Sequence, residues 1–435
     1  MKNTELEERL LRPVCGDADQ PMVCAKKLVG DPEGWPIAQV IEWLQTDGRF
    51  APTVPFLLEA LSKKLVEVGA PIWRVMIGYR TLHPKVAAEG AIWTRGQDAV
   101  VRRRSDHGIW TREEYIGSPV EQVYEKKGPI RWRLDNLDPE KDHTVLQEIK
   151  AAGGTDYFGQ YFSFAKSRGG SFMVATDRES GFTDSDIVKL EALLKFLTPV
   201  LEVIVLHSVA TNLLDTYLGP RTGQRVLNGT VQRGDGEVID AALWFSDLRE
   251  FTKMTEHLPP EELIDVLNTY FEHVYQAVNT YGGEVLRFIG DAMLIVFPAE
   301  SEDKRREACK AALDAAMDAF SSLAVLNKLR RRRGKPEIRF GVGLHVGHVV
   351  YGNVGAPERL DFTVMGSAVN RTARLESLTK QVGVPLLISK EFKMLTGAPS
   401  TYRGEYEVKG LDTKMPVYSY RGFDMAYGLT PPESG

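Results

Sequence analysis

The sequence predicts an α+β protein of two domains joined by a long helix. At 435 residues the chain is too long for one typical hydrophobic core, so two domains are expected. A run of apolar residues at alternating spacings of three and four separates the halves and predicts the connecting helix. The second half has the order strand, helix, hairpin, helix, strand, which predicts a sheet with helices on one face.

Charge and cysteine usage exclude several classes of protein. The net charge of -5 argues against general nucleic-acid binding, and the basic run 328–335 is interpreted as the solvated end of a helix and its loop. The cysteines are few, lack metal-ligand spacing and fit a reducing cytoplasm: Cys15, Cys24 and Cys309. We therefore expect a cytoplasmic protein.

The sequence predicts no membrane span. The first residues lack the apolar core of a signal peptide. The longest apolar run, 193–206, is interrupted by Lys195, Pro199 and Glu202. We expect no part of the chain to cross a membrane.

Residues 51–182 are predicted to form an α+β domain of the size of a sensor domain, after an N-terminal segment, 1–50, with weak signals. An apolar period near 3.6 predicts a helix at 52–65. Strand-like runs follow at 72–79, 91–93, 99–103, 158–164 and 171–176.

A signalling helix and linker are predicted at 183–237. Thr183 can cap the helix, with Asp186 reaching back to it. The apolar positions fit the seam of a coiled coil with a second copy: Ile187, Leu190, Leu194, Leu197, Leu201 and Ile204. The alternative is a helix packed on its own domain. Pro199 is expected to kink or break it, and 228–236 is interpreted as a linker.

The second domain is predicted at 238–422, followed by a tail, 423–435. A buried strand at 241–245 precedes a helix opened by Pro260. Strands at 284–289 and 292–297 form a hairpin around Gly290-Asp291, and a second helix follows at 301–329. In the strand 338–346 the apolar residues alternate with glycines, so something must approach the glycine face closely.

The candidate active-site residues are two aspartates and a pair of polar residues on one face of a predicted helix. Asp247 ends a buried strand and Asp291 lies at a hairpin tip, so both carboxylates can share divalent cations if the hairpin lies beside that strand. Asn370 and Arg374 are four residues apart on a predicted helix, where arginine can hold phosphate oxygens. The alternatives are that Asp247 caps a helix and Asp291 serves a turn. For Asn370 and Arg374 the alternative is a solvated helix face.

Several ordered segments resemble class III nucleotidyl cyclases, the adenylate and guanylate cyclase catalytic domain. The resemblance covers about 238–422 and implies a ferredoxin-like βαββαβ core. The matching segments are Phe245-Ser-Asp-Leu-Arg-Glu-Phe-Thr252, Gly282-Gly-Glu-Val-Leu-Arg-Phe-Ile-Gly-Asp291, Gly352-Asn-Val-Gly355 and Asp361-Phe-Thr-Val-Met-Gly-Ser-Ala-Val-Asn-Arg-Thr-Ala-Arg-Leu-Glu376.

The resemblance implies a role for each matching position. Asp247, Leu248 and Asp291 would bind two divalent metal ions, Mg or Mn. Asn370 would orient the ribose, and Arg374 would stabilise charge on the α-phosphate. The other implied substrate-binding residues are Phe251, Thr252, the triphosphate-binding Lys409, and the base-reading pair Arg287 and Thr363. The family pairs two catalytic domains head to tail, so a homodimer with shared active sites is implied.

Two departures from the family pattern affect the expected activity. Adenylate cyclases usually carry lysine and guanylate cyclases glutamate at the position of Arg287, so a cation favours ATP. Thr363 fits a subgroup of bacterial adenylate cyclases. Glu250 replaces the usual glycine and would repel the triphosphate unless Arg249 neutralises it or it points away. We expect conversion of ATP to cyclic AMP; the alternatives are a silent nucleotide sensor and a guanylate cyclase.

The N-terminal domain more weakly resembles a GAF or related sensor domain, through Phe182-Thr-Asp-Ser-Asp-Ile-Val-Lys-Leu190 at the start of the connecting helix. The resemblance implies an input, a small molecule or a protein, that the sequence does not identify. Aromatic residues are interpreted as core or as pocket lining: Trp73, Trp93, Trp110, Trp132, Tyr157 and Phe158. The histidines His83, His107 and His143 lack a spacing that supports haem or metal binding.

Overall fold

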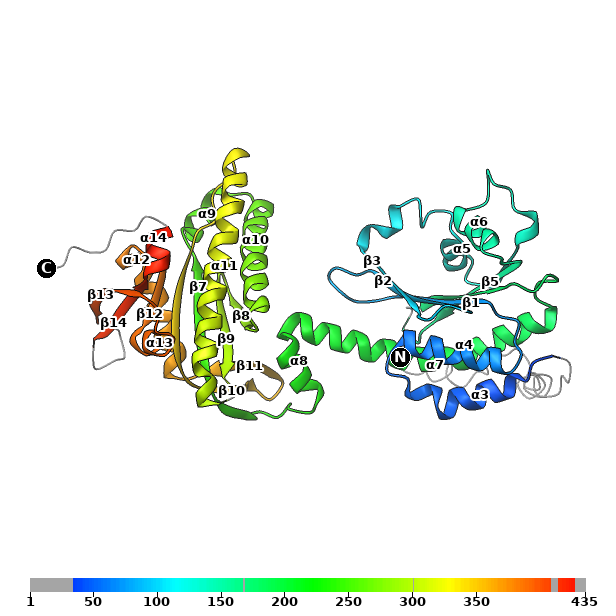
Figure 1. Cartoon of the computed structure of the whole chain (residues 1–435), viewed down its shortest axis with the longest axis horizontal. Coiled ribbons are helices and arrows are strands. Elements are labelled where there is room, and N and C mark those ends of the chain that lie inside the picture. The colour runs from blue at the N-terminus through cyan, green and yellow to red at the C-terminus, as the bar shows by residue number, and fades with distance from the viewer. Residues whose placement is uncertain (1–33, 167–168, 300, 408–413, 427–435) are drawn as a thin grey trace, which may run out of the picture. The chain divides into compact units, whose positions relative to one another are not determined.

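The computed structural model describes residues 34–166, 169–299, 301–407 and 414–426. The chain divides into two compact units, Met1–Thr216 and Tyr217–Gly435, and each is described by itself (Figure 1). Lys409, Cys15 and Cys24 lie outside the described residues.

The N-terminal unit is built on a six-stranded antiparallel sheet in the order β3-β2-β1-β6-β5-β4. Its strands are β1 (Arg74–Arg80), β2 (Ala88–Thr94), β3 (Val101–Ser105), β4 (Ile130–Arg133), β5 (Asp156–Ser163) and β6 (Gly169–Thr176). Five of them match expected strands. The short β4 was not expected, because Arg131 and Arg133 interrupt its apolar pattern.

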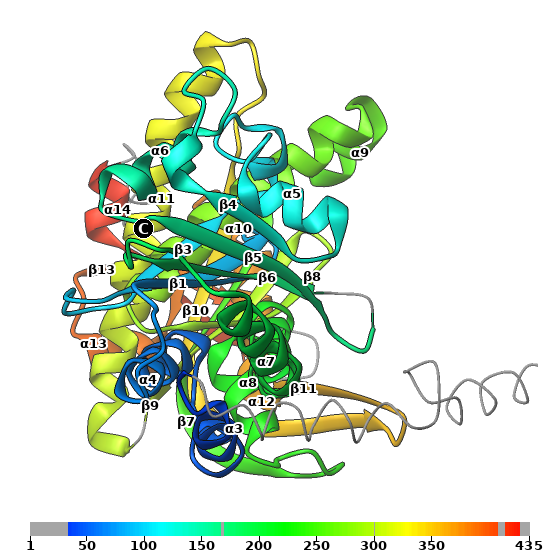
Figure 2. The same cartoon turned by 90° about the vertical axis from the view of Figure 1, so that its right-hand side faces the viewer.

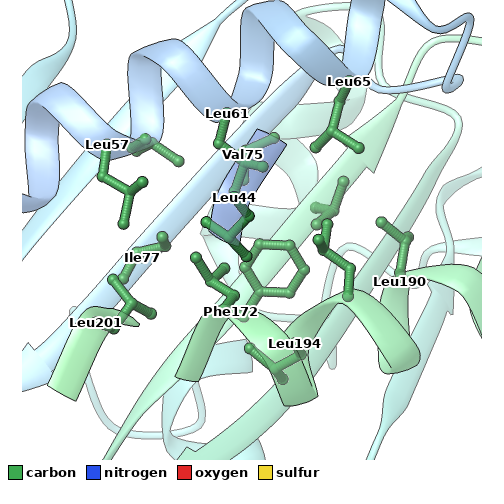
Figure 3. Close-up of a cluster of buried hydrophobic side chains, with 14 of the residues drawn as sticks. Leu44, Leu57, Leu61, Leu65, Val75, Ile77, Phe172, Leu190, Leu194 and Leu201 are labelled. Atoms are coloured by element: carbon green, nitrogen blue, oxygen red, sulfur yellow. The ribbon is translucent and has the colours of Figure 1, made fainter. Parts of the chain in front are cut away.

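Helices cover both faces of this sheet. On one face lie α3 (Ile37–Thr46), α4 (Val54–Glu67) and α7 (Asp184–Leu218), and on the other α5 (Pro119–Lys126) and α6 (Thr144–Ala151), as Figure 2 shows. The described part of this unit also contains three short 3-10 helices: η1 (Gly48–Phe50), η2 (His107–Thr111) and η3 (Leu134–Asn136). Leu61 of α4, Phe172 of β6 and Leu194 of α7 meet in the larger core (Figure 3).

The start of α7 agrees with its predicted cap. Thr183 Oγ1 accepts a hydrogen bond from the Asp186 N–H at 3.1 Å, and Asp186 Oδ2 accepts one from the Thr183 N–H at 2.8 Å. The helix then continues for 35 residues and does not end at Pro199. Among the described residues, α7 is long and apolar enough to cross a membrane by length and composition, although 44% of its most apolar window is buried inside the protein.

The predicted coiled-coil seam of α7 is wrong, and the alternative of packing on its own domain is what the structure has. Five of the six seam residues, from Leu190 to Ile204, are buried in the core with α3, α4 and the sheet, and Ile187 packs against that core. Burial against an adjacent sheet leaves these side chains unavailable to a second copy. The spacing was correct for a buried stripe but did not identify what covers it.

The C-terminal unit begins with α8 (Pro220–Leu227), a short helix that the sequence did not predict. Thr222 donates its backbone N–H and its hydroxyl to Glu284 Oε1, at 3.2 and 3.1 Å. Tyr351 donates its hydroxyl to Glu284 Oε2 at 3.0 Å. This buried network holds α8 against the sheet, because an unpartnered Glu284 carboxylate would be costly to bury.

An eight-stranded sheet forms the core of the C-terminal unit. Its order is β13-β14-β12-β10-β7-β9-β8, with β11 paired to β10. The strands are β7 (Gly236–Leu248), β8 (Glu284–Ile289), β9 (Ala292–Ala299), β10 (Phe340–Ala356), β11 (Arg359–Met365), β12 (Leu386–Ser389), β13 (Ser400–Tyr406) and β14 (Met415–Tyr420). The predicted hairpin is β8–β9, and β7 lies at the centre between β9 and β10.

Helices lie on both faces of this sheet, which corrects the expectation of helices on one face. The core with α10 (Pro260–Thr280) and α11 (Arg305–Arg332) fills one face, while α12 (Ser367–Val382) lies against Gly341, Gly343 and Gly347 on the other. The close approach that these glycines predicted is therefore made by a helix. The shorter helices are α9 (Phe251–His257), η4 (Glu302–Lys304), α13 (Lys390–Thr396) and α14 (Arg421–Ala426).

Candidate active site

Strand pairing brings the two predicted aspartates together. Asp247 lies at the end of the central strand β7 and pairs with Ala292 of β9. Asp291 immediately precedes Ala292, in the turn between β8 and β9. Gly290 allows this turn, because its φ of 64° lies in the left-handed region that favours glycine. The hairpin therefore lies beside the first strand, as the sequence argument required.

The two carboxylates repel each other. Burial, and next the neighbouring charge of Asp247, raises the pKa of Asp291 to about 6. Lys380 of α12 offsets part of this charge, since its Nζ lies 2.8 Å from Asp247 Oδ2. A facing pair of acids with one surface ammonium is an anionic site that a divalent cation would stabilise.

The donor set fits Mg²⁺ or Mn²⁺ held jointly with a substrate. Within the described ranges, no group of three or more histidine, cysteine, aspartate or glutamate side chains could hold a metal by itself. Mg²⁺ commonly uses one or two carboxylates together with phosphate oxygens. Asp247 and Asp291 supply two such carboxylates, and Leu248 is the buried last residue of the same strand.

Glu250, which stands where the cyclase family usually has glycine, lies in the segment after β7. This residue has a φ of 60°, a left-handed conformation that favours glycine. Its carboxylate contacts Lys253 Nζ at 3.2 Å and Arg339 Nη2 at 3.3 Å. Phe251 and Thr252, the implied substrate-binding residues, are the first residues of α9.

The expectation that Arg249 neutralises Glu250 is wrong. Arg249 instead faces α12, where its Nη1 lies 3.5 Å from Glu376 Oε1 and its Nη2 donates to Thr379. Glu376 is buried, and its burial, with the charge of Asp247, raises its pKa to about 7. A buried carboxylate needs a paired cation, so Glu376 holds the guanidinium and Glu250 is left to the surface cations Lys253 and Arg339.

The implied base-reading residues lie on facing strands. Arg287 on β8 forms an ion pair with Asp361 on β11. Thr363 is two residues further along β11 and therefore on the same face of that strand, opposite Gly352 of β10. Asp361 was quoted in the family-like segment but not recognised as a partner of Arg287. Its charge, opposite to that of Arg287, was the available signal.

The helix α12 carries Asn370 and Arg374. Buried residues such as Thr372 and Glu376 face the sheet, whereas Asn370 is exposed and Arg374 is half-buried. Neither side chain makes a hydrogen bond or ion pair with another described residue. The ion-pair partner of Asp247 on this helix is Lys380, which sequence reasoning missed. Thus no such contact within one chain joins Asn370 or Arg374 to the aspartate pair.

The comparisons with known proteins identify the region around this site. The family described as the adenylate and guanylate cyclase catalytic domain matches residues 236–422. Adenylate cyclase 1 of Rhizobium meliloti is 33% identical over 192 residues, which are 43% of this chain and 28% of that protein. The adenylate cyclase of Anabaena cylindrica is 32% identical over 200 residues, 44% of this chain and 38% of that protein. The chain thus spans well under half the length of these relatives.

Solved structures of cyclases are also similar to part of this chain. The adenylyl cyclase CyaB of P. aeruginosa is 28% identical with a TM-score of 0.40, covering 43% of this chain and 95% of that one. The guanylyl cyclase Cya2 is 28% identical with a TM-score of 0.39, covering 45% and 98%.

Proposed function

We propose, from the premise that residues 236–422 are a class III adenylate and guanylate cyclase catalytic domain, that this chain is an adenylate cyclase. It would convert ATP to cyclic AMP and pyrophosphate by in-line attack of the ribose 3′-hydroxyl on the α-phosphate. The position of Asp291, in the β8–β9 turn beside Asp247 at the end of β7, supports this proposal most strongly.

Asp247, Leu248 and Asp291 would hold two divalent ions, Mg or Mn. Such ions lower the pKa of an attacking hydroxyl and neutralise departing phosphate oxygens. The chain itself would supply position and charge: Asn370 orients the ribose, and Arg374 stabilises negative charge that grows on the α-phosphate. Phe251 and Thr252 would contact the substrate beside Asp247, and Lys409 its triphosphate.

The adenine base would be read by Arg287 and Thr363. A free arginine fork can also pair with the O6 and N7 acceptors of guanine, so the fork alone does not select ATP. The ion pair with Asp361 occupies part of the guanidinium. The remaining N–H groups suit a single acceptor such as adenine N1, which supports ATP as the substrate.

A homodimer would complete the site by placing Asn370 and Arg374 of one chain opposite the aspartates of the other. A second apolar stripe on α7 supports this pairing. It has alternating spacings of three and four and consists of Phe196, Pro199, Val203, Leu206, Ala210 and Leu213. Phe196, Val203 and Leu206 are 41%, 66% and 58% exposed. Such a stripe fits a parallel coiled coil with the same stripe of a second copy.

Cysteine cross-linking tests which stripe of α7 pairs. With the three native cysteines replaced by alanine, Val203→Cys should form a disulfide-linked dimer on mild oxidation. The matched variant Ile204→Cys should not, because Ile204 is buried in the core of its own unit. Equal cross-linking of both variants, or of neither, would contradict the proposed dimer through this stripe.

The N-terminal unit would gate the enzyme through α7, in the cytoplasm. Its sheet packs directly on the buried stripe of α7, so an input that shifts this packing would bias the exposed stripe between two pre-existing arrangements. A chain beginning at Asp235 that matched the full chain in activity and in dimer affinity would exclude gating through α7.

Product analysis by mass spectrometry tests the function itself. The purified full chain would be incubated with ATP or GTP, in Mg²⁺ and in Mn²⁺, with Asp291→Asn as the control. We expect cyclic AMP that is lost, by a factor of at least about 100, in the control. Cyclic GMP instead would overturn the base assignment. Absence of both products would indicate a nucleotide-binding sensor without turnover.

A further inference from the structure

The N-terminal unit contains a cavity of about 610 Å³. It lies between the sheet face formed by β1, β2, β3, β5 and β6 and the covering elements η2, α5 and α6. Figures 1 and 2 show α5 and α6 over that face. The volume is within the range of small-molecule sites. We refer to this cavity as the N-terminal pocket.

Small residues form the floor of the N-terminal pocket. Gly78 of β1 pairs with Gly90 of β2 on one side and with Ser171 of β6 on the other, so the three lie side by side across the sheet. The neighbouring row, Met76 beside Met173, carries longer side chains, and the cavity continues over it, since Met76 also lines the pocket. Because the residues of the row formed by Gly78, Gly90 and Ser171 are small, the cavity is deepest above them.

Aromatic side chains form the walls: Trp110, Tyr115, Tyr124 and Tyr157. Trp110 and Tyr115 meet edge to face, with ring centroids 4.9 Å apart. Such rings present flat apolar surfaces at low cost in conformational entropy, which suits an aromatic ligand.

Two polar groups in the N-terminal pocket lack a partner. The Ser171 side chain is fully buried, and its Oγ has no hydrogen bond to any described residue. Arg74 is half-buried and forms no ion pair with any described residue. The nearby carboxylate of Glu89 is already bound, by Arg104 Nε and by the Tyr79 hydroxyl, each at 3.0 Å. A buried hydroxyl without a hydrogen-bond partner and a guanidinium without an ion-pair partner favour a ligand that supplies hydrogen-bond acceptors and negative charge.

The acidic and basic groups at the rim do not reverse this charge. Glu148 is exposed. Arg112 pairs with Asp106 at 2.5 Å and with Glu114 at 3.6 Å. Arg103 also lines the pocket and, like Arg74, has no ion pair within the described part of the chain. The cations without partners thus outnumber the acids without partners.

The strand register sets the length of the ligand. Arg74 pairs with Ala175, which is four residues from Ser171 along β6. Four residues of strand span roughly 13 Å. A ligand that touches both groups is therefore elongated, with about the length of two linked aromatic rings.

We propose that the N-terminal pocket binds an elongated aromatic anion, whose carboxylate pairs with Arg74 and whose far end hydrogen-bonds to Ser171. The binding site does not depend on cyclase activity. Its identification with the input that gates the enzyme rests on the proposed function, and binding is measured without turnover, so the two can fail separately.

Calorimetric titration of the full chain tests the charge of the ligand. The ligands used would be a para-hydroxybiphenyl carboxylate and its neutral carboxamide, which has nearly the same shape. We expect saturable binding of the carboxylate, about tenfold or more tighter than that of the carboxamide. Absence of carboxylate binding, or equal binding of both compounds, would overturn the proposal.

Variants test the two contacts. Arg74→Gln should abolish the preference for the carboxylate, and Arg74→Lys should keep most of it. Ser171→Ala, which removes an unpartnered hydroxyl, should fold normally and weaken binding about fivefold. Arg102→Gln is the control for the loss of one arginine charge, because Arg102 lies on β3 of the same sheet but does not line the N-terminal pocket. A preference for the carboxylate that persists in Arg74→Gln would overturn the assigned contact.

Discussion

Each of the two sheets carries a patch of small residues on one face, and the two patches have different fates. In the C-terminal unit, Gly341, Gly343 and Gly347 are covered by α12, whose backbone and side chains occupy the space that a Cβ would need. In the N-terminal unit, Gly78 and Gly90 lie under a cavity. Small residues in a strand therefore predict that something approaches closely, but either a helix or an open pocket can follow.

The two regions also differ in whether their charged side chains have ion-pair partners. Around the glycines of the C-terminal unit, Arg249 is paired with Glu376 and Asp247 with Lys380. In the N-terminal pocket, Arg74 has no ion-pair partner among the described residues. Paired charges stabilise a packed interface, whereas an unpaired cation inside a cavity leaves a place for a ligand.

The largest expected effect comes from adding one methyl group under α12. A Cβ at Gly343 would lie 2.5 Å from the Glu376 backbone nitrogen and 2.6 Å from the Thr372 carbonyl oxygen. Gly343→Ala should therefore destabilise the C-terminal unit by about 3 kcal/mol. The matched variant Gly78→Ala should cost less than about 1 kcal/mol, because its nearest neighbour is the Ser171 hydroxyl at 3.2 Å. Urea unfolding of both variants measures the difference, and equal losses would break the comparison.

A comparable effect comes from pH, through the carboxylate buried beneath α12. The pKa of Glu376 is about 7 in the folded protein and 4.5 in a free side chain. Between these values the folded state keeps a proton that the unfolded state has lost. The contribution of Glu376 to stability is therefore full below pH 4.5 and is lost as pH rises to about 7, by roughly 3 kcal/mol. Asp291, with a pKa of about 6, acts in the same direction.

Thermal unfolding without divalent ions, at intervals from pH 4.5 to 8, measures this slope. Glu376→Gln should flatten the upper part of the curve for the C-terminal unit. Glu307→Gln, on the exposed face of α11, should leave it unchanged. A wild-type curve that rises with pH over this interval would contradict the assigned direction.

The next effect concerns the one position near the active site where glycine is favoured but absent. Glu250→Gly should stabilise the C-terminal unit by about 1 kcal/mol, because glycine adopts a φ of 60° without strain. It should also raise cyclase turnover by removing a carboxylate beside the substrate. Glu250→Ala separates the two effects, since it removes the charge and keeps the strained backbone. A loss of turnover in both variants would contradict the electrostatic role.

The smallest effect concerns the surface ion pair at the aspartates. Lys380→Met removes the ammonium that neutralises Asp247 and should raise the affinity for Mn²⁺ about two- to threefold. Lys380→Arg keeps the charge and should leave the affinity nearly unchanged. Titration of Mn²⁺ followed by electron paramagnetic resonance measures both. A weaker affinity in Lys380→Met would indicate that Lys380 supports metal binding instead of competing with it.

The sequence by itself determined the local features whose cause lies within a few residues. The cap of α7 by Thr183 and Asp186, the hairpin at Gly290-Asp291 and the alternation along β10 all agree with the structure. The meeting of Asp247 and Asp291 was also predictable, because a central strand and an adjacent hairpin leave little freedom in where their ends lie. The roles of Leu248, Asn370, Arg374, Thr363 and Lys409 remain predictions.

Tertiary structure alone decided which surfaces are covered. Helix α7 carries two apolar stripes with heptad spacing. Only packing showed that the Leu190–Ile204 stripe is buried, whereas Phe196, Val203 and Leu206 of the other stripe are exposed. Arg249 met Glu376 instead of Glu250 because burial, which the sequence does not display, makes one carboxylate the stronger partner. Periodicity and charge can be read from residues close together along the chain, whereas burial depends on residues far apart in sequence. For that reason the sequence did not show which small-residue patch a helix covers and which one lies under a cavity.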